Sequence, residues 1–282
     1  MSDAPRRVLV VGATGTQGGA VVDALLAADA EFDVFGLTRS PESAAAERLR
    51  ERGVSVVAGD ATDRESLDRA LAETDADGVF LMTTGGAETE RRQGETVVAA
   101  AEAAGVDHLV FSSGGNAGGG SHVPHVAAKF AVEQRLRESP MRWTILRPHS
   151  FVSNLARSRG EIAEGRLAFP IPEGDRFAFV DHRDIGRLAV RAFRDPARFD
   201  EETIELAGAV VSLPELADAV SDVVGRPVDP TPIPPAAMGD GMATFAAFMA
   251  ESAAVVNPDR LRRQYDFEPR GLREALRDSD WL

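Results

Sequence analysis

Short apolar runs alternate with helically spaced apolar residues through the first half of the chain. The run over 8–11 is continuous and rich in valine, as in a strand that is buried on both faces. Val21, Val22, Leu25 and Leu26 then recur at the spacing of one helix face. The same patterns predict strands over 33–38, 54–58, 78–82, 108–111 and 142–146, and helices over 44–52, 62–71, 90–104 and 124–137.

Strands that alternate with helices form a parallel sheet with helices on both faces. The pattern therefore predicts an α/β fold with a doubly wound parallel sheet of the Rossmann type. Thr62 and Glu65 have the Thr-x-x-Glu spacing of a capping box, which predicts that the helix over 62–71 begins there.

After residue 147 this alternation stops, and the elements become fewer. The patterns predict a helix over 184–193, a strand over 203–206, a helix over 214–224, an extended connector with five prolines over 227–235, and a helix over 236–256. We expect a Rossmann domain over 1–150 and a smaller C-terminal α/β lobe over 151–282, with about 184–207 packing back on the sheet. Ligands of such folds bind at the carboxyl ends of the strands.

Composition narrows the possible functions. With 282 residues, 44% of them hydrophobic, the chain can bury a sizeable core. Its 31 basic and 45 acidic side chains give a net charge of −14, so we expect neither nucleic acid nor membrane as a partner. The chain has no cysteine, no apolar stretch that could cross a membrane and no signal-peptide pattern at its start, which favours the cytoplasm.

The basic residues are distributed unevenly between two types. Lys129 is the only lysine among the 31 basic side chains, and all the others are arginine. An acidic chain with so little lysine is typical of adaptation to high salt or of a high-GC genome. Either source would remove lysine wherever arginine can serve, so Lys129 marks a position where arginine fails. A chance solvent-facing lysine is the alternative.

Gly12, Gly15 and Gly18 lie between the first strand and the first helix, in the sequence Gly-Ala-Thr-Gly-Thr-Gln-Gly-Gly. In a dinucleotide-binding turn the first glycine permits the sharp turn, the second lets the backbone approach a pyrophosphate, and the third lets helix and strand pack closely. Helix-terminal N–H groups then face the phosphates. We expect Thr14, Thr16 and Gln17 to share this site; a purely structural turn is the alternative.

The choice of cofactor is indicated after the second strand. A carboxylate there would hold the ribose of NAD, whereas an arginine accommodates the 2′-phosphate of NADP. The sequence has Thr38, Arg39 and Ser40 and no carboxylate at this point. Because Arg39 can make a forked contact with phosphate, NADP(H) is expected over NAD(H). Alternatively, Arg39 pairs with one of the acidic side chains.

Two further strand ends supply candidate cofactor contacts. Asp60 and Ala61 follow the third strand, where the adenine would rest, and Asp60 can accept a hydrogen bond from the adenine amine. Thr83, Thr84 and Gly85 follow the fourth strand, over the path of the cofactor. These residue types also form ordinary turns, and this alternative stays open.

The candidate catalytic residues follow the fifth strand. Ser112 and Ser113 end that strand, and His125 and Lys129 stand four residues apart on one face of the next helix. In a carbonyl reductase, this helix presents a proton donor to the nicotinamide. A lysine with an ordinary pKa of ~10.4 can serve once burial or the positive nicotinamide lowers that pKa, whereas arginine stays protonated. His125 is either a proton relay or an ordinary polar residue of the first helical turn, and no metal site is expected.

The motifs together resemble the NmrA-like family of atypical short-chain dehydrogenases, which includes HSCARG-like NADP(H)-binding proteins and quinone reductases. The resemblance rests on Val-Gly-Ala-Thr-Gly-Thr-Gln-Gly-Gly over 11–19, Phe-Ser-Ser over 111–113, Lys-Phe-Ala-Val-Glu over 129–133, Trp-Thr-Ile-Leu-Arg-Pro over 143–148, Phe151, Asn154, and Asp-Ile-Gly over 184–186. It covers roughly residues 6–210.

The resemblance implies an NADP-binding domain, a smaller lobe and a substrate cleft between them. Carried over by position, the glycine turn with Gln17 would hold the pyrophosphate, Arg39 the 2′-phosphate and Lys129 the nicotinamide ribose. The segment with Pro148, Phe151 and Asn154 would face the nicotinamide. The Tyr-x-x-x-Lys pair of ordinary short-chain dehydrogenases is absent, because His125 stands at the position of the tyrosine.

Three functions are compatible with these residues. The first is an NADPH-dependent reductase of a small apolar quinone, enone or other carbonyl compound, in which Lys129 or His125 supplies or relays a proton and Ser112 or Ser113 orients the oxygen. The second is a non-catalytic NADP(H) sensor that regulates a protein partner. The third is an epimerase or isomerase that keeps its cofactor bound. The sequence leaves the oligomeric state open.

Overall fold

The computed structural model describes residues 4–28, 30–120, 122–172, 174–233, 235–279 and 281–282. The chain divides into two compact units. The first comprises Met1–Arg147 with Ile185–Ile204, and the second comprises Pro148–Asp184 with Glu205–Leu282.

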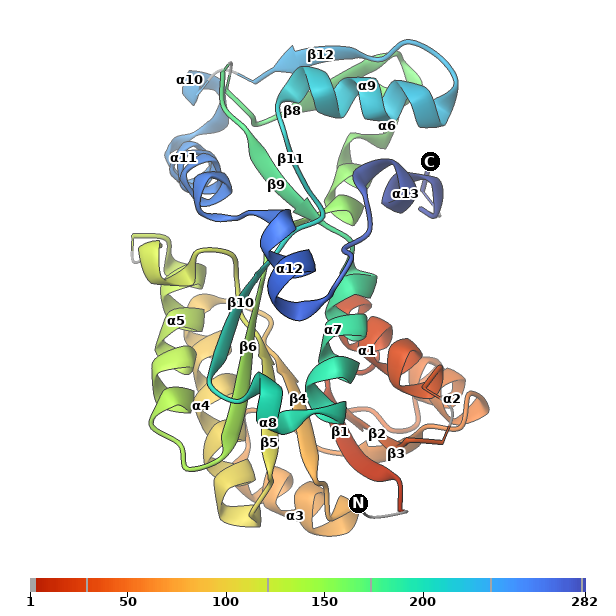
Figure 1. Ribbon diagram of the computed structural model, residues 1–282, viewed down its shortest axis with the longest axis vertical. Helices are drawn as coiled ribbons and strands as arrows, with labels where there is room; N and C mark the ends of the chain where they lie inside the picture. The colour runs from red at the N-terminus through yellow and green to blue at the C-terminus, as the bar shows by residue number, and fades with distance from the viewer. Residues whose placement is uncertain (1–3, 29, 121, 173, 234, 280) are drawn as a thin grey trace. The chain divides into compact units, whose positions relative to one another are not determined.

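A seven-stranded sheet forms the centre of the first unit, in the order β10-β6-β5-β4-β1-β2-β3 (Figure 1). Its strands are β1 (Arg6–Val11), β2 (Phe32–Thr38), β3 (Ser55–Ala58), β4 (Gly78–Met82), β5 (His108–Ser112), β6 (Arg142–Pro148) and β10 (Glu202–Leu206). The strand pairs from β3 to β6 are all parallel. Because the strand order reverses between β1 and β4, ligands are expected at the carboxyl ends of these two strands. The arrangement confirms the predicted doubly wound α/β fold.

Helices cover both faces of this sheet: α4 and α5 lie on one face and α1 and α7 on the other (Figure 1). The helices that carry residues of the first unit are α1 (Thr16–Leu26), α2 (Ala44–Glu51), α3 (Arg64–Thr74), α4 (Ala87–Ala104), α5 (Pro124–Arg137), α7 (His182–Arg194) and the short α8 (Pro196–Phe199). Close helix contacts depend on small residues. A Cβ on Gly94 of α4 would lie 2.2 Å from a methyl carbon of Val132 on α5. This contact fixes the distance between the two helices that carry the candidate site.

The start of α3 differs from the prediction. Asp63, and not Thr62, is the N-cap, and its side chain accepts a hydrogen bond from the Ser66 N–H. The Thr62 hydroxyl instead donates to Asp60 Oδ1 at 2.8 Å. The capping box of Thr62 and Glu65 was therefore wrong, because the carboxylate one residue later caps the helix while Thr62 closes the preceding turn.

The second unit contains two small sheets, with strand orders β11-β9-β7 and β12-β8. The strands are β7 (Ser150–Phe151), β8 (Arg166–Phe169), β9 (Phe177–Val180), β11 (Ala209–Val211) and β12 (Asp229–Pro232). The helices are α6 (Arg159–Ala163), α9 (Leu213–Val224), α10 (Pro235–Met238), α11 (Asp240–Val255), α12 (Pro258–Tyr265) and α13 (Leu272–Arg277). A capping box starts α9, in which Ser212 and Glu215 bond each other's backbone N–H.

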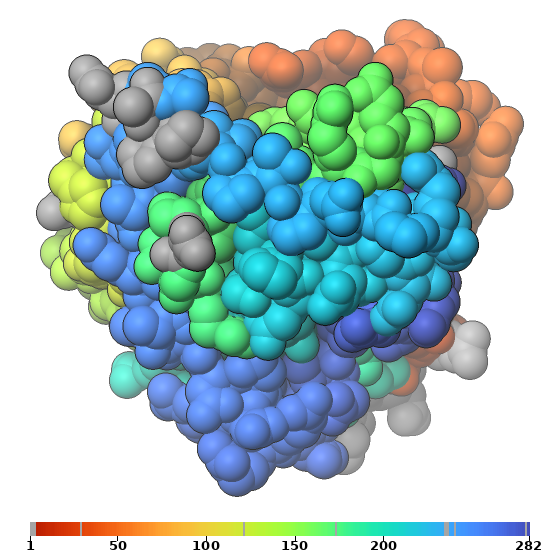
Figure 2. Space-filling model, turned by 90° about the horizontal axis from the view of Figure 1, so that it is seen from above, coloured from red at the N-terminus to blue at the C-terminus, as the bar shows by residue number. Residues whose placement is uncertain are grey.

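The sequence predicts an extended connector over 227–235, but part of this proline-rich segment forms a strand. Within it, β12 pairs in parallel with β8, with Pro230 opposite Leu167. Asp229 N–H donates to the Gly165 carbonyl oxygen at 2.8 Å. Prolines at alternate positions are tolerated in an edge strand, because their missing N–H groups lie on the side away from the ladder. Strand β12 is exposed and lies beside α9, which is cyan in Figure 2.

The helix predicted over 236–256 is divided into α10 and α11. Gly239 separates them with a φ of 70° and a ψ of 156°, a backbone conformation that favours glycine.

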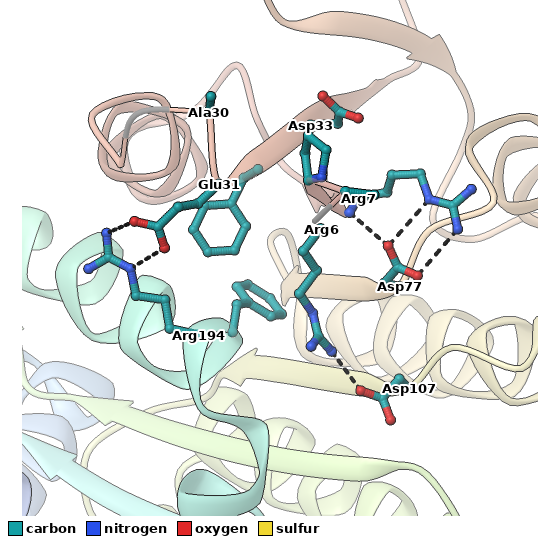
Figure 3. Close-up of a pocket in the computed structure, with 12 residues that line it drawn as sticks. Arg6, Arg7, Ala30, Glu31, Asp33, Asp77, Asp107 and Arg194 are labelled. Atoms are coloured by element: carbon teal, nitrogen blue, oxygen red, sulfur yellow. Dashed lines mark hydrogen bonds and ion pairs between the residues drawn. The ribbon is translucent and has the colours of Figure 1, made fainter. Parts of the chain in front are cut away.

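Ion pairs join the amino ends of the first unit's strands, around a surface hollow of about 1130 Å³ (Figure 3). Arg6 contacts Asp107, Arg7 contacts Asp77, and Arg194 contacts Glu31 through two bonds of 2.7 Å. The hollow lies at the edge opposite to the carboxyl ends of the strands. Because these pairs are partly exposed, we assign them a modest contribution to stability.

His108 at the start of β5 is fully buried. The Thr144 hydroxyl donates to the Phe199 carbonyl oxygen at 2.7 Å, so it accepts from His108 Nε2–H, which lies 2.8 Å away. His108 Nδ1 has no partner among the described residues. Burial lowers the pKa of His108 to about 4.

This histidine should make the fold sensitive to acid. We expect the free energy of unfolding to fall by about 2 kcal/mol between pH 7 and pH 5, because the unfolded chain gains a proton at His108 in this range and the folded chain does not. His108→Gln, whose amide can still donate to Thr144, should lose this part of the fall in urea titrations at the two pH values. Equal losses of stability in both proteins would refute the assignment.

Candidate nucleotide site

The glycine turn between β1 and α1 needs glycine for steric reasons. Gly12 has a φ of 80°, and its carbonyl oxygen accepts from the Gly15 N–H at 2.9 Å. A Cβ on Gly18 would lie 2.1 Å from the same oxygen, so α1 and β1 can approach this closely only with glycine there. These are the geometries predicted for the first and third glycines.

The start of α1 can receive an anion. Within the described residues, no side chain caps this helix and its first turn carries no acidic group. Thr14, Gly15 and Thr16 are exposed, and a Cβ on Gly15 would meet only the Gly12 oxygen, at 3.4 Å. The N–H groups and the positive end of the helix dipole are therefore available to a phosphate group. The turn thus fits the pyrophosphate of a dinucleotide.

The two serines that end the β5 segment have different partners. Ser112 Oγ donates to Gln17 Oε1 at 2.8 Å, which joins the end of β5 to the first turn of α1. Ser113 Oγ donates to the buried Glu133 of α5 at 2.6 Å. Glu133 also accepts two bonds from Arg147 of β6, at 2.9 and 2.6 Å. Ser112 therefore belongs to the glycine turn, whereas the hydroxyl hydrogen of Ser113 is used inside the unit.

Arg39 is exposed directly after β2 and makes no ion pair with any residue that the structure describes. Asp60, after β3, accepts bonds of 2.8 Å from the Thr62 N–H and hydroxyl. The pKa of Asp60 is lowered, chiefly by the hydrogen bond from the Thr62 N–H, and the positive charges of Arg39 and Arg92 lower it further. Asp60 thus shapes a turn beside Arg39, and Ala61 packs against the core.

The residues after β4 face α4 and α5. Gly85 has a φ of 117°, and the Thr84 N–H donates to Gln93 Oε1 of α4 at 2.9 Å. Thr83 is buried, and its hydroxyl accepts from Lys129 Nζ at 2.9 Å. Thr83 and Lys129, predicted separately, are therefore in contact.

Lys129 lies in a largely buried polar cluster. Its side chain is 18% exposed, and its ammonium contacts Glu90 Oε1 of α4 at 3.1 Å. Burial lowers the pKa of Lys129, while the Glu90 carboxylate opposes this shift. The direction of the shift makes Lys129 a better proton donor near neutral pH than an exposed lysine. A chance solvent-facing lysine is inconsistent with this geometry.

His125 reaches the same carboxylate from the surface. Its Nδ1 lies 3.2 Å from Glu90 Oε2, and its side chain is 59% exposed. Glu90, with an 8% exposed side chain, connects the two candidate residues of α5. Glu90 was not predicted from the sequence, because nothing in the pattern distinguishes this carboxylate from the other acidic residues. Only the packing of α4 on α5 buries it.

Pro148, Phe151 and Asn154 belong to the second unit. Pro148 ends β6, Phe151 pairs with Val180 of β9, and Asn154 lies in the 3-10 helix Val152–Ser158. The adjacent His149 is fully buried at its side chain, with Nε2 2.9 Å from Glu205 Oε2. The role of this segment beside a nicotinamide stays a prediction.

The described part of the chain holds no group of three or more side chains arranged to bind a metal ion. Among its described helices, none combines the length and the apolar character needed to span a bilayer.

Comparisons with known proteins agree with the predicted resemblance. The NmrA-like family profile matches residues 5–262. A NAD(P)H azoreductase of Xenophilus azovorans is 33% identical over 270 residues, which cover 93% of this chain and 92% of that protein.

Solved structures share the fold. The triphenylmethane reductase of Citrobacter sp., in complex with NADP(H), gives a TM-score of 0.80 at 21% identity and covers 96% of this chain and 98% of its own. An NADPH-dependent quinone oxidoreductase of Escherichia coli, in complex with NADPH, gives the same TM-score and identity over 95% and 98% of the two chains. From the extent of the profile match and the identity to the azoreductase, the chain belongs to the NmrA-like family, as its motifs predicted.

Proposed function

We propose that this protein binds NADP(H) at the carboxyl edge of its first sheet and reduces a small apolar quinone, enone or other carbonyl compound. The observation that carries the proposal is the only lysine of the chain, Lys129, which is largely buried and bound to Thr83 and Glu90 beyond the end of β4. Because β4 neighbours β1, this ammonium and the glycine turn share one edge of the sheet. The reductase names of the relatives support the proposal.

The residues of the first unit fit the cofactor. The start of α1 would hold the pyrophosphate, the exposed Arg39 would hold the 2′-phosphate, and Lys129 would hold the nicotinamide ribose. When bound, NADPH supplies the hydride. The protein itself would donate a proton from Lys129, because burial lowers the pKa of this ammonium. Ser112 would orient the carbonyl oxygen once its hydroxyl turns from Gln17 Oε1 to the substrate.

Turnover tests this proposal. NADPH is mixed with the protein at high salt and with a panel of quinones, enones, aldehydes and azo dyes, while the nicotinamide absorbance is followed. We expect oxidation of NADPH in preference to NADH, and a loss of about 100-fold in kcat for Lys129→Arg, which keeps the charge but cannot give up its proton. If NADPH binds but no compound of the panel oxidises it, the reductase function is overturned and the sensor function remains. The histidine at position 125, where ordinary short-chain dehydrogenases have a tyrosine, favours that function.

Arg39→Ala tests the choice of cofactor. Loss of a charge-assisted contact should weaken NADPH binding about tenfold and leave NADH binding unchanged, as measured by fluorescence titration. Equal losses for both cofactors, or none, would contradict the assignment of Arg39 to the 2′-phosphate.

A further inference from the structure

We propose that Glu90 is a positioning residue that passes protons from the exposed His125 to the buried Lys129, so that the ammonium is restored after each donation. The inference rests on the proposed reductase function and adds the route by which the proton donor is reloaded.

The carboxylate of Glu90 spans the distance between the two side chains of α5. Its Oε1 lies 3.1 Å from Lys129 Nζ, and its Oε2 lies 3.2 Å from His125 Nδ1. The side chains of Lys129, Glu90 and His125 are 18%, 8% and 59% exposed. One carboxylate oxygen therefore contacts a largely buried ammonium, and the other contacts a solvent-exposed imidazole.

The backbone around this chain of contacts is fixed. Gly94 lets α4 approach Val132 of α5, one helical turn beyond both Glu90 and Lys129. Lys129 is also held by the hydroxyl of Thr83, the residue after β4, and a Cβ on Gly114 would lie 3.5 Å from Lys129 Cδ. Among the described residues, Glu90 is the carboxylate that forms an ion pair with this ammonium. Glu90 is therefore placed to pass a proton to Lys129.

The transfers balance. When Lys129 Nζ gives its proton to the substrate oxygen, it becomes a neutral amine. His125 then gives its Nδ1 proton to Glu90 Oε2, the carboxyl group turns, and the proton passes to Lys129 Nζ. His125 takes a new proton from water, and Glu90 is again a carboxylate. No oxidation accompanies these steps, and an imidazole is suited to them because its two ring nitrogens can both donate and accept a proton.

A spectroscopic test needs neither cofactor nor substrate. Because Lys129 is the only lysine, protein labelled with [13Cε]lysine gives one side-chain signal that reports its titration. Glu90→Gln should move the midpoint of this titration to lower pH, since the opposing carboxylate is lost. Glu88→Gln, on the exposed side of the same helical turn, should leave it in place. An unchanged midpoint in Glu90→Gln would overturn the inference.

Kinetics test the relay itself. We expect Glu90→Gln and His125→Ala each to lower kcat about tenfold, with KM for NADPH within twofold of wild type and with Glu88→Gln unchanged. Added imidazole should restore kcat in His125→Ala, whose site is exposed, and not in Glu90→Gln. If the wild-type protein turns over and both variants have its kcat, the relay is overturned while the proposed function stands. Absence of wild-type turnover on any substrate would overturn the proposed function, while the lysine signal would still report whether Glu90 acts on Lys129.

Discussion

Gly18→Ala is expected to lower the free energy of unfolding by about 3 kcal/mol and to abolish NADPH binding. The new Cβ would lie 2.1 Å from the Gly12 oxygen and 2.5 Å from the Gly12 carbonyl carbon. Because these are backbone atoms of the turn, relief requires α1 to move away from β1, and overpacking of this kind is costly. The helix start would then leave the position where it receives a phosphate. Urea unfolding without cofactor and a fluorescence titration with NADPH measure the two effects.

The neighbouring glycine provides a matched control. A Cβ on Gly19 would meet its nearest atom, the Ala13 oxygen, at 3.8 Å, which is ordinary contact. Since alanine is a better helix former than glycine by about 1 kcal/mol, Gly19→Ala should be neutral or stabilising and should bind NADPH normally. Equal stability of the two variants would contradict the close approach of α1 and β1.

The fold was predictable where local chemistry decides the element. Pro124 begins α5 as predicted, because proline suits the first position of a helix. Prediction failed where a neighbour decides. The strand β12 exists because β8 offers a partner, and no local pattern of its prolines indicates that. Similarly, Thr62 and Asp63 could each cap α3, but the Thr62 hydroxyl donates to Asp60 and leaves Asp63 as the cap.

The candidate site was predictable to the same extent. The glycine turn is specified by steric needs within one short segment, and Lys129 stands out through composition alone. Glu90 was missed, and no role was predicted for Glu133 of the Lys-Phe-Ala-Val-Glu motif. The burial of these two carboxylates depends on Lys129 and Arg147, which lie 39 and 14 residues away along the chain. A sequence with 45 acidic residues does not show which of them lies inside.

Glu133→Ala should lower the free energy of unfolding by about 4 kcal/mol, the largest effect that we expect from a single side chain. Glu133 is 0% exposed and Arg147 is 15% exposed. The substitution removes the carboxylate that accepts from Arg147 and from the Ser113 hydroxyl. Removing one partner of a buried ion pair costs roughly 3–5 kcal/mol, because the remaining charge stays buried without a partner. Urea unfolding at constant salt measures the loss.

Two further variants separate a lost ion pair from a lost side chain. Glu102→Ala removes an ion pair between α4 and α5, but Glu102 and Arg135 are 20% and 31% exposed, so this change should cost about 1 kcal/mol or less. Arg147→Met in the Glu133→Ala background removes the charge left by the first change and should recover part of the stability. If the double variant is as unstable as the sum of its single changes, Glu133 stabilises the unit through packing and not through its charge.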